Sequence, residues 1–419
     1  VAAKALVLPA LLLSVVGLRA LRSAGFLSSR RAYRAALRSQ GTSKLDGPRL
    51  AATVADEADA PIAGSVREGL AVILPNQKQG ASFQEAFYNP VMVFNRDLAM
   101  VALAAFSELR QEEAKAANGG VQAETADAGL SVLDAFAATG LRSLRYALEL
   151  PDCVQRIVAN DCDPDAVRHI QRNAEHNGLK DRIEVSCEDA MRMHELGPFD
   201  VIEIDPFGSA SLYLDSAVRA VADGGLLAVT STDGRVLCGS DPDRSLAWYG
   251  GRAIRGRGYT KEVGLRLLLQ KVATCASRHG CTIEPLASLW IDYYARVYVR
   301  IHRRSAEIPE VPQKSVVHQC IRCDSFFLSR AEDMGDQLGD LRERATSSSG
   351  PPGVGPRCPE CGGAFVMAGP FFRGPTWQRA FVERMIAICK ERRIRGVTSW
   401  RKVEGILAAL SGEVLEAPL

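Results

Sequence analysis

The most constraining feature of this sequence is the alternation, from residue 129 onward, of short apolar runs with helical patterns. Runs of this kind bounded by turn residues indicate strands, and their alternation with helices is typical of a doubly wound parallel sheet. Helices are predicted over 141–150, from Pro164 to Asn177, and over 259–279. The predicted strands are SVLDAF (131–136), RIVAND (156–161), RIEVSCED, FDVIEID, GLLAVTST, IEPLASLW and ARVYVRIH. We therefore predict an α/β domain over residues 66–305.

Acidic residues stand at the ends of four successive predicted strands, at Asp134, Asp161, Asp189 and Asp205. Open α/β sheets bind ligands at this carboxyl edge. A carboxylate at Asp161 can accept both hydroxyls of a ribose, which suits NAD and S-adenosylmethionine equally. Gly140 opens the next helix, whose first amides can meet a carboxylate. We interpret these residues as cofactor-binding, and the alternative for the Gly140 segment is a tight turn without a ligand.

The fourth predicted strand ends in Asp205-Pro206-Phe207-Gly208, which favours a methyl donor. Methyltransferases that act on the amino groups of bases resemble this pattern. An exocyclic amine delocalises its lone pair into the ring, and a carboxylate that accepts its N–H directs that pair toward the donor. We predict Asp205 and Phe207 as catalytic, with Phe207 stacking on the base for about 1–3 kcal/mol and Pro206 beside the substrate. The alternative is a capped turn with a buried phenylalanine.

The segment FYNPVMVFNRD (87–97) places many polar and aromatic residues before the sheet begins. Arg96 is predicted to pair with the methionyl carboxylate of the cofactor, and Phe87 or Tyr88 to form the second wall around the base. The alternative is a helix-capping segment. Arg142 and Arg145, in the first helix of the sheet domain, are either ligand contacts or part of a solvated face, and we favour a contact for Arg142 only.

Four of the eleven cysteines form two CxxC pairs, Cys320–Cys323 and Cys358–Cys361. This spacing is typical of a four-thiolate structural zinc ribbon, for which His318 is an unnecessary further ligand. The remaining cysteines are scattered singly and are interpreted as buried small apolar residues in a reducing compartment, at positions 153, 162, 187, 238, 275, 281 and 389.

The first 45 residues contain eight Lys or Arg and no acid, and their apolar run (5–18) is too short to span a bilayer. This composition is typical of an organellar transit segment, so we expect import into a plastid or mitochondrion, with the nucleus or cytoplasm as the alternative. Residues 46–65 are predicted as a linker. Because residue 1 is Val, we expect that the natural start precedes it.

The motifs together resemble the tRNA guanine-26 N2-dimethyltransferases over roughly residues 66–385. The resemblance is carried by VREGLAVILP, FYNPVMVFNRD, LDAFAATGLRSLRYA, DPFGSAS, GGLLAVTSTD, EVGLRLLL, WIDYYARVYVRIH and the CxxC pairs. It implies a Rossmann-like, S-adenosylmethionine-dependent methyltransferase core, a family-specific C-terminal domain (306–419), and transfer of one or two methyl groups to N2 of guanine-26. It also implies cofactor contacts at Arg96, Arg142, Asp161 and Asp189, with Asp205 as the catalytic carboxylate. Since the family continues further, we expect a C-terminal truncation at Leu419 or a divergent tail.

The implied partner is tRNA, and we expect a monomer without stable membrane association. A formal net charge of +2 gives no global basic field, so RNA contacts require local clusters of Lys and Arg. The rival hypotheses are an amino-methyltransferase acting on another nucleic acid or on protein, and a non-catalytic RNA-binding module.

Overall fold

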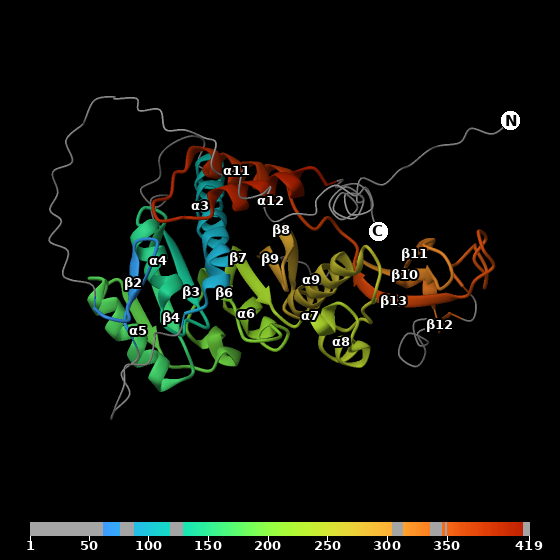
Figure 1. Cartoon of the computed structure of the whole chain (residues 1–419), viewed down its shortest axis with the longest axis horizontal. Coiled ribbons are helices and arrows are strands. Elements are labelled where there is room, and N and C mark those ends of the chain that lie inside the picture. Colours follow the sequence, from blue (N-terminus) through green and yellow to red (C-terminus); the bar gives the residue numbers. More distant parts are fainter. Residues whose placement is uncertain are drawn as a thin grey trace, which may run out of the picture. The chain divides into compact units, whose positions relative to one another are not determined.

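The computed structural model describes residues 62–75, 88–117, 129–303, 313–335, 346–347 and 350–413. A seven-stranded sheet with the order β5-β4-β3-β6-β7-β9-β8 lies at its centre (Figure 1). Only β9 runs against its neighbours β7 and β8, and the other pairs are parallel. The strands are β3 (Leu130–Asp134), β4 (Val154–Asn160), β5 (Ile183–Ser186), β6 (Phe199–Ile204), β7 (Val221–Ser231), β8 (Cys281–Ile291) and β9 (Tyr294–Arg303). The α/β prediction is confirmed.

Both faces of the sheet are covered because successive apolar residues of each strand point to opposite sides. Val132 packs into one core and Leu133 into the other, and the same alternation holds for Val201 and Ile202. The first core contains α3 (Val93–Ala117), α4 (Leu141–Glu149), α5 (Pro164–His176), α11 (Arg379–Glu391) and α12 (Trp400–Ser411). The second contains η3 (Ala190–Glu195), α6 (Leu214–Ala220), α7 (Gly234–Leu237), α8 (Pro242–Tyr249) and α9 (Thr260–Arg278).

Local signals set the helix boundaries near the site. Pro164 is the first residue of α5, and the Asp163 side chain accepts a hydrogen bond from the Asp165 amide, which caps an orphan donor. Gly178, with φ of 69°, follows the helix end at Asn177. The predicted helix from Pro164 to Asn177 is therefore confirmed to within one residue.

A smaller antiparallel sheet has the order β11-β10-β13-β12. Its strands are β10 (Lys314–Cys320), β11 (Phe326–Arg330), β12 (Thr346–Ser347) and β13 (Phe365–Phe372), and η4 (Ala331–Met334) follows β11. Arg252 and Gly369 exchange backbone hydrogen bonds of 2.7 and 2.8 Å, which join this sheet to the segment between α8 and α9. Gly251 allows this approach, since a Cβ there would lie 2.3 Å from the Pro370 oxygen.

The segments at either end of the described chain pack on the central domain. The hairpin of β1 (Val66–Glu68) and β2 (Ala71–Ile73) lies against α4 and α5, and α11 and α12 pack on α3 (Figure 1). The domain boundary at residue 305 stays a prediction. The predicted leader (1–45) and linker residues 46–61 lie outside the described residues.

One described helix, Pro90–Ala117, which comprises η2 (Pro90–Met92) and α3, is long and apolar enough to cross a membrane. In this structure 72% of its most apolar window is buried inside the protein, where α3 forms part of the first core. The cysteine interpretation is wrong at two positions, because Cys162 and Cys187 are exposed, each beyond the end of its strand.

Candidate active site

The four predicted acidic residues lie at the carboxyl edge of the central sheet, after or at the ends of β3, β4, β5 and β6. Asp161 accepts hydrogen bonds from the Ala138 amide (2.9 Å) and the Asp163 amide (3.0 Å). Asp189 is exposed and caps η3 by accepting from the Met191 amide. Asp161 and Asp189 are therefore oriented by backbone amides at the edge where a ligand would bind.

Asp134 differs from these two carboxylates because it is buried. Its Oδ2 accepts a 2.8 Å hydrogen bond from the Ser143 hydroxyl in α4. Burial raises the pKa of Asp134 to about 6, although Arg142 and the Ser143 hydrogen bond oppose the shift. Asp134 thus supports the turn between β3 and α4 from within the protein.

The β3–α4 turn has the backbone shape that its small residues predict. Ala138 and Gly140 both have positive φ, 52° and 77°. A Cβ at Gly140 would lie 3.2 Å from Ile170 of α5, so glycine suits this position both by conformation and by space. The turn presents the start of α4 toward the ligand edge, and Gly140 is where the sequence predicted it.

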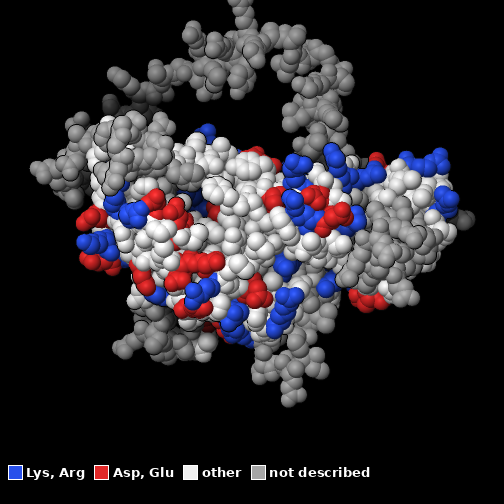
Figure 2. Space-filling view, turned by 90° about the horizontal axis from the view of Figure 1, so that it is seen from below, with Lys and Arg blue, Asp and Glu red and all other residues white. Residues whose placement is uncertain are grey.

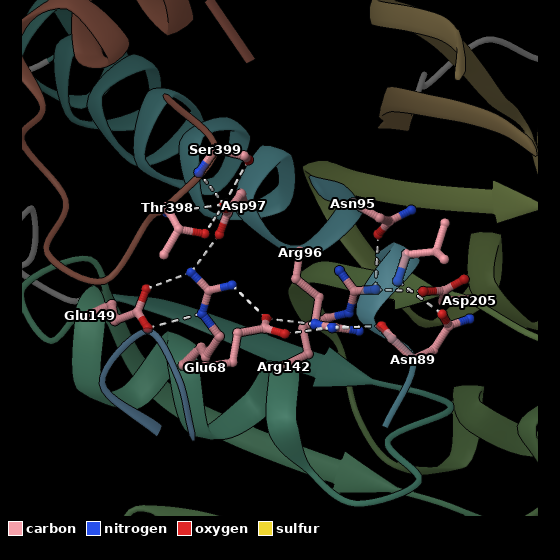
Figure 3. A network of polar contacts seen from close by, with 12 residues as sticks. Glu68, Asn89, Asn95, Arg96, Asp97, Arg142, Glu149, Asp205, Thr398 and Ser399 are labelled. Carbon is pink, nitrogen blue, oxygen red and sulfur yellow. Dashed lines mark hydrogen bonds and ion pairs between the residues drawn. The ribbon is translucent and has the colours of Figure 1, made fainter. Parts of the chain in front are cut away.

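The Asp205 carboxylate is held by Arg142 (Figure 3). The Arg142 Nη2 atom donates to Asp205 Oδ2 at 2.5 Å and to Asn95 Oδ1 at 3.0 Å. The Asn95 amide in turn donates to Thr230 Oγ1 of β7 at 3.2 Å. No described residue forms a hydrogen bond with Asp205 Oδ1, and the side chain is 18% exposed. One carboxylate oxygen is fixed and the other is available to a substrate.

A second layer of buried charge supports this arrangement. Glu203, on β6, binds Arg296 of β9 at 2.8 and 2.9 Å, accepts from the Tyr146 hydroxyl at 2.5 Å, and lies 3.8 Å from Arg142. Burial alone would raise the pKa of Glu203, but Arg296 and Arg142 outweigh it and hold the pKa below its ordinary value. Sequence reasoning missed Glu203, Arg296 and Tyr146, although a charge inside an apolar strand was a usable signal.

The turn after β6 exposes an aromatic side chain. Pro206 is buried, whereas Phe207 is 90% exposed, so the alternative of a buried phenylalanine is wrong. Gly208 has φ of 86° and its amide donates to Thr232 Oγ1, while the Thr232 amide donates to the Gly208 oxygen, both at 2.9 Å. These bonds attach the turn that follows β6 to Thr232, the residue directly after β7.

Arg96 is engaged by a carboxylate of the protein itself. Its Nε and Nη2 atoms donate to Glu68 of β1 at 2.7 and 2.5 Å, and the Tyr88 ring lies over its guanidinium at 5.5 Å. Asn89 caps η2, which agrees with the helix-capping alternative for this residue. Phe87 lies outside the described residues. The structure thus places Tyr88 beside Arg96, the residue that directly follows Asn95 in α3.

Arg145 is neither a ligand contact nor part of a solvated face, because it is fully buried. It forms ion pairs with Glu68 (2.8 Å), Asp97 (2.8 Å) and Glu149 (2.9 Å). The other oxygen of Asp97 accepts from the amides and hydroxyls of Thr398 and Ser399, just before α12 (Figure 3). This cluster connects β1, α3, α4 and the C-terminal helices behind the site.

The two CxxC pairs come together at one end of the small sheet. The sulfur atoms of Cys320, Cys323, Cys358 and Cys361 all lie within 4.8 Å of one another. Tetrahedral zinc with Zn–S bonds of about 2.3 Å requires sulfur separations of about 3.8 Å, so this donor set fits zinc. His318 lies outside this group, and its buried ring nitrogens have no hydrogen-bond partner among the described residues.

The edge of the central sheet likewise fits S-adenosylmethionine. Asp161 can accept ribose hydroxyls with its remaining lone pairs, and the small residues of the β3–α4 turn leave room for close approach.

Comparison with known proteins agrees with this site. A family model described as N2,N2-dimethylguanosine tRNA methyltransferase matches residues 69–419. The tRNA (guanine(26)-N(2))-dimethyltransferase of Mus musculus is 34% identical over 86% of this chain, which spans 59% of that protein. The mitochondrial enzyme of the same name from Saccharomyces cerevisiae is 31% identical over 84% of this chain, which spans 68% of that protein.

A solved structure is also similar. Trm1 from Pyrococcus horikoshii in complex with S-adenosyl-L-methionine superposes with a TM-score of 0.62 at 26% identity, and the match covers 84% of this chain and 83% of that one. The similarity includes more than the central sheet, since it extends over most of both chains.

Proposed function

This chain belongs to the N2,N2-dimethylguanosine tRNA methyltransferase family, and we propose that it transfers methyl groups from S-adenosylmethionine to the exocyclic N2 of guanine-26 in tRNA. The observation that carries the proposal is Asp205 at the end of β6. Arg142 fixes its Oδ2, its Oδ1 has no hydrogen-bond partner in the described chain, and the exposed Phe207 follows two residues later. A carboxylate and an aromatic ring so placed suit a planar base that carries an amine.

We propose that Asp205 accepts the N2 hydrogen with Oδ1, which directs the amine lone pair away from the ring, and that it takes up the proton released when N2 becomes methylated. When bound, S-adenosylmethionine supplies an electrophilic methyl group on a sulfonium, so catalysis depends mainly on positioning. The Arg142 contact keeps the carboxylate in one orientation.

We propose that the cofactor is held by Arg96, Gly140, Asp161 and Asp189. Asp134 supports the β3–α4 turn from within the protein, and Arg142 acts by orienting Asp205, with a direct cofactor contact of Arg142 as the alternative. Asp161 would accept the ribose hydroxyls and Asp189 would lie toward the base of the adenosyl group. Arg96 and Arg142 now neutralise Glu68 and Asp205, so any contact of theirs with the cofactor carboxylate is shared with these partners.

We propose that guanine-26 leaves the RNA stack to reach this edge, at a cost of a few kcal/mol. Phe207 stacks on one face of the base, and Phe87 or Tyr88 contacts the other, with Pro206 shaping the turn. Stacking on each ring offsets about 1–3 kcal/mol of that cost.

The test is incubation of the protein with methyl-labelled S-adenosylmethionine and unmodified tRNA, followed by nucleoside analysis. Label is expected in N2-methylguanosine or N2,N2-dimethylguanosine, with none when position 26 is adenine and almost none with Asp205→Asn. Label in another nucleoside or in a protein substrate would support the rival methyltransferase hypothesis. Binding of tRNA without any transfer would support the non-catalytic module.

We also propose a monomer without stable membrane association that is imported into a plastid or mitochondrion, with the nucleus or cytoplasm as the alternative. Support comes from the basic, acid-free composition of residues 1–45. A fusion of residues 1–65 to a fluorescent protein should accumulate in the organelle, and a diffuse signal would contradict import.

A further inference from the structure

Several exposed basic side chains between the ligand edge and the small sheet form no ion pair with any described residue. Some other surface arginines, such as Arg156, Arg192 and Arg384, are paired with glutamates. Because unpaired cations keep their full charge for a partner, their grouping is informative. We call this group the basic strip, and it consists of Arg235, Arg255, Lys261, Arg322 and Arg357.

The segments that carry the strip are in contact with one another. Arg235 belongs to α7, just after β7, and a Cβ on Gly239 at the end of α7 would lie 2.9 Å from the Arg255 amide. From there the chain reaches the small sheet: Arg257 approaches the Cys320 oxygen at 3.5 Å, and Tyr259 contacts the Phe326 ring at 5.1 Å. The segments that carry the strip therefore adjoin one another from the ligand edge to the cysteine cluster, where the exposed Asp324 pairs with Arg257 at 3.5 Å.

The far end of the strip is formed by the cysteine turns themselves. Arg322 lies between Cys320 and Cys323, its amide donating to Cys320 Sγ, and Arg357 directly precedes Cys358. Ile321 and Phe326 are also exposed in this turn, at 53% and 42%. Figure 2 shows basic side chains at the end of the molecule that holds β10 and β11, with acidic side chains at one margin of that end.

We propose that the basic strip and Phe326 bind the sugar-phosphate backbone and an exposed base of tRNA at a site away from the target guanine. Cations interleaved with an exposed aromatic ring suit RNA, because phosphates neutralise the former and bases stack on the latter. An acidic protein would match the cations but would not use Phe326. The inference rests on the proposed function, since it names how the substrate of the same site is held.

The geometry gives this contact a fixed relation to the ligand edge. The backbone pairing of Arg252 with Gly369 and the bonds from Arg266 of α9 to the Phe372 and Gly374 oxygens (3.1 and 2.9 Å) fasten the small sheet to the methyltransferase domain. The strip can therefore select RNAs that present a backbone segment at one distance from the flipped base.

The experiment compares the full chain with Arg322→Ala, Arg357→Ala, Phe326→Ala and the triple variant, and it measures the Kd for tRNA at several salt concentrations. Loss of each arginine should weaken binding roughly fivefold and lower the slope of log K against log salt by about 0.7–0.9. Phe326→Ala should weaken binding without changing the slope. Affinity for S-adenosylmethionine and zinc content should stay at wild-type levels.

The matched control is Arg278→Ala, an exposed arginine without an ion pair in the described chain. Arg278 is the last residue of α9. The first residue of this helix lies beside the strip, roughly 27 Å away along the helix axis. Equal weakening by the control, or unchanged tRNA binding in the triple variant, would overturn the inference. If wild type methylates tRNA but the triple variant binds normally, only the inference fails. If tRNA binding depends on the strip yet no methylation occurs, only the proposed function fails.

Discussion

The contact between Arg142 and Asp205 allows two roles of one arginine to be separated. Arg142→Met removes the 2.5 Å bond to Asp205 and the 3.0 Å bond to Asn95 but keeps most of the side-chain volume. Glu203 keeps Arg296 at 2.8 Å, whereas the buried Asp134 loses the attraction of Arg142. A hydrogen bond to a charged group contributes about 1.5–3 kcal/mol. If that energy orients Asp205 for the transition state, the rate of methyl transfer falls roughly 10- to 150-fold.

The assay is single-turnover methylation at saturating tRNA and S-adenosylmethionine, with cofactor affinity measured separately by calorimetry. The variant should transfer methyl groups slowly while the Kd for the cofactor changes by less than about threefold. Loss of a charged hydrogen bond to the cofactor would change this Kd by more than that. Arg142→Lys keeps the charge without the planar fork, so an intermediate rate is expected. A large rise in the cofactor Kd together with a wild-type rate at saturation would refute the positioning role and assign Arg142 to the cofactor.

Four further predictions concern single groups. Asp161→Ala should weaken S-adenosylmethionine through lost ribose hydrogen bonds of roughly 0.5–1.5 kcal/mol each, and unchanged affinity in calorimetry would contradict its role. Replacing Cys358 and Cys361 by Ser should release the metal and lower the melting temperature, because a structural zinc site contributes folding energy; the reading fails if elemental analysis finds no zinc in the intact protein. Since burial raises the pKa of Asp134 from 3.8 to about 6, its contribution to stability is present below pH 3.8 and lost as pH rises through 6. Asp134→Asn should thus gain stability relative to wild type across this window, by about 3 kcal/mol above it, as measured by urea unfolding at several pH values. Phe207→Ala should slow methylation of whole tRNA by the equivalent of about 1–3 kcal/mol with unchanged cofactor affinity, and loss of cofactor binding would contradict the stacking role.

The parts of the site that sequence predicted are those fixed by local pattern. Short apolar runs define the strands, and parallel strands necessarily bring their carboxyl ends to one edge, so Asp161 and Asp205 had to lie there. The two CxxC turns are equally local, and a metal that closes them tolerates the long insertion between. Phe207, which follows Asp205-Pro206, was predicted to stack on a base, and its exposure agrees with that prediction.

The parts that sequence did not predict depend on contacts between distant segments. Arg145 lies one helical turn from Arg142 and carries the same charge, yet its partners Glu68 and Asp97 come from β1 and α3. Nothing within the helix pattern distinguishes these two arginines. Only packing of the hairpin and α3 against α4 buries one of them completely and turns the other toward Asp205.

The buried charges explain why segments far from the ligand edge belong to the site. A buried ion pair adds little net stability because desolvation offsets the attraction, but removal of one partner costs roughly 3–5 kcal/mol. Asp97 illustrates this asymmetry, since it pairs with Arg145 through one oxygen and receives Thr398 and Ser399 through the other. Undocking of the segment before α12 would remove the amide and hydroxyl donors of Thr398 and Ser399 from that oxygen. The C-terminal helices are therefore held to α3, and α3 also carries the Asn95 side chain that orients Arg142 beside Asp205.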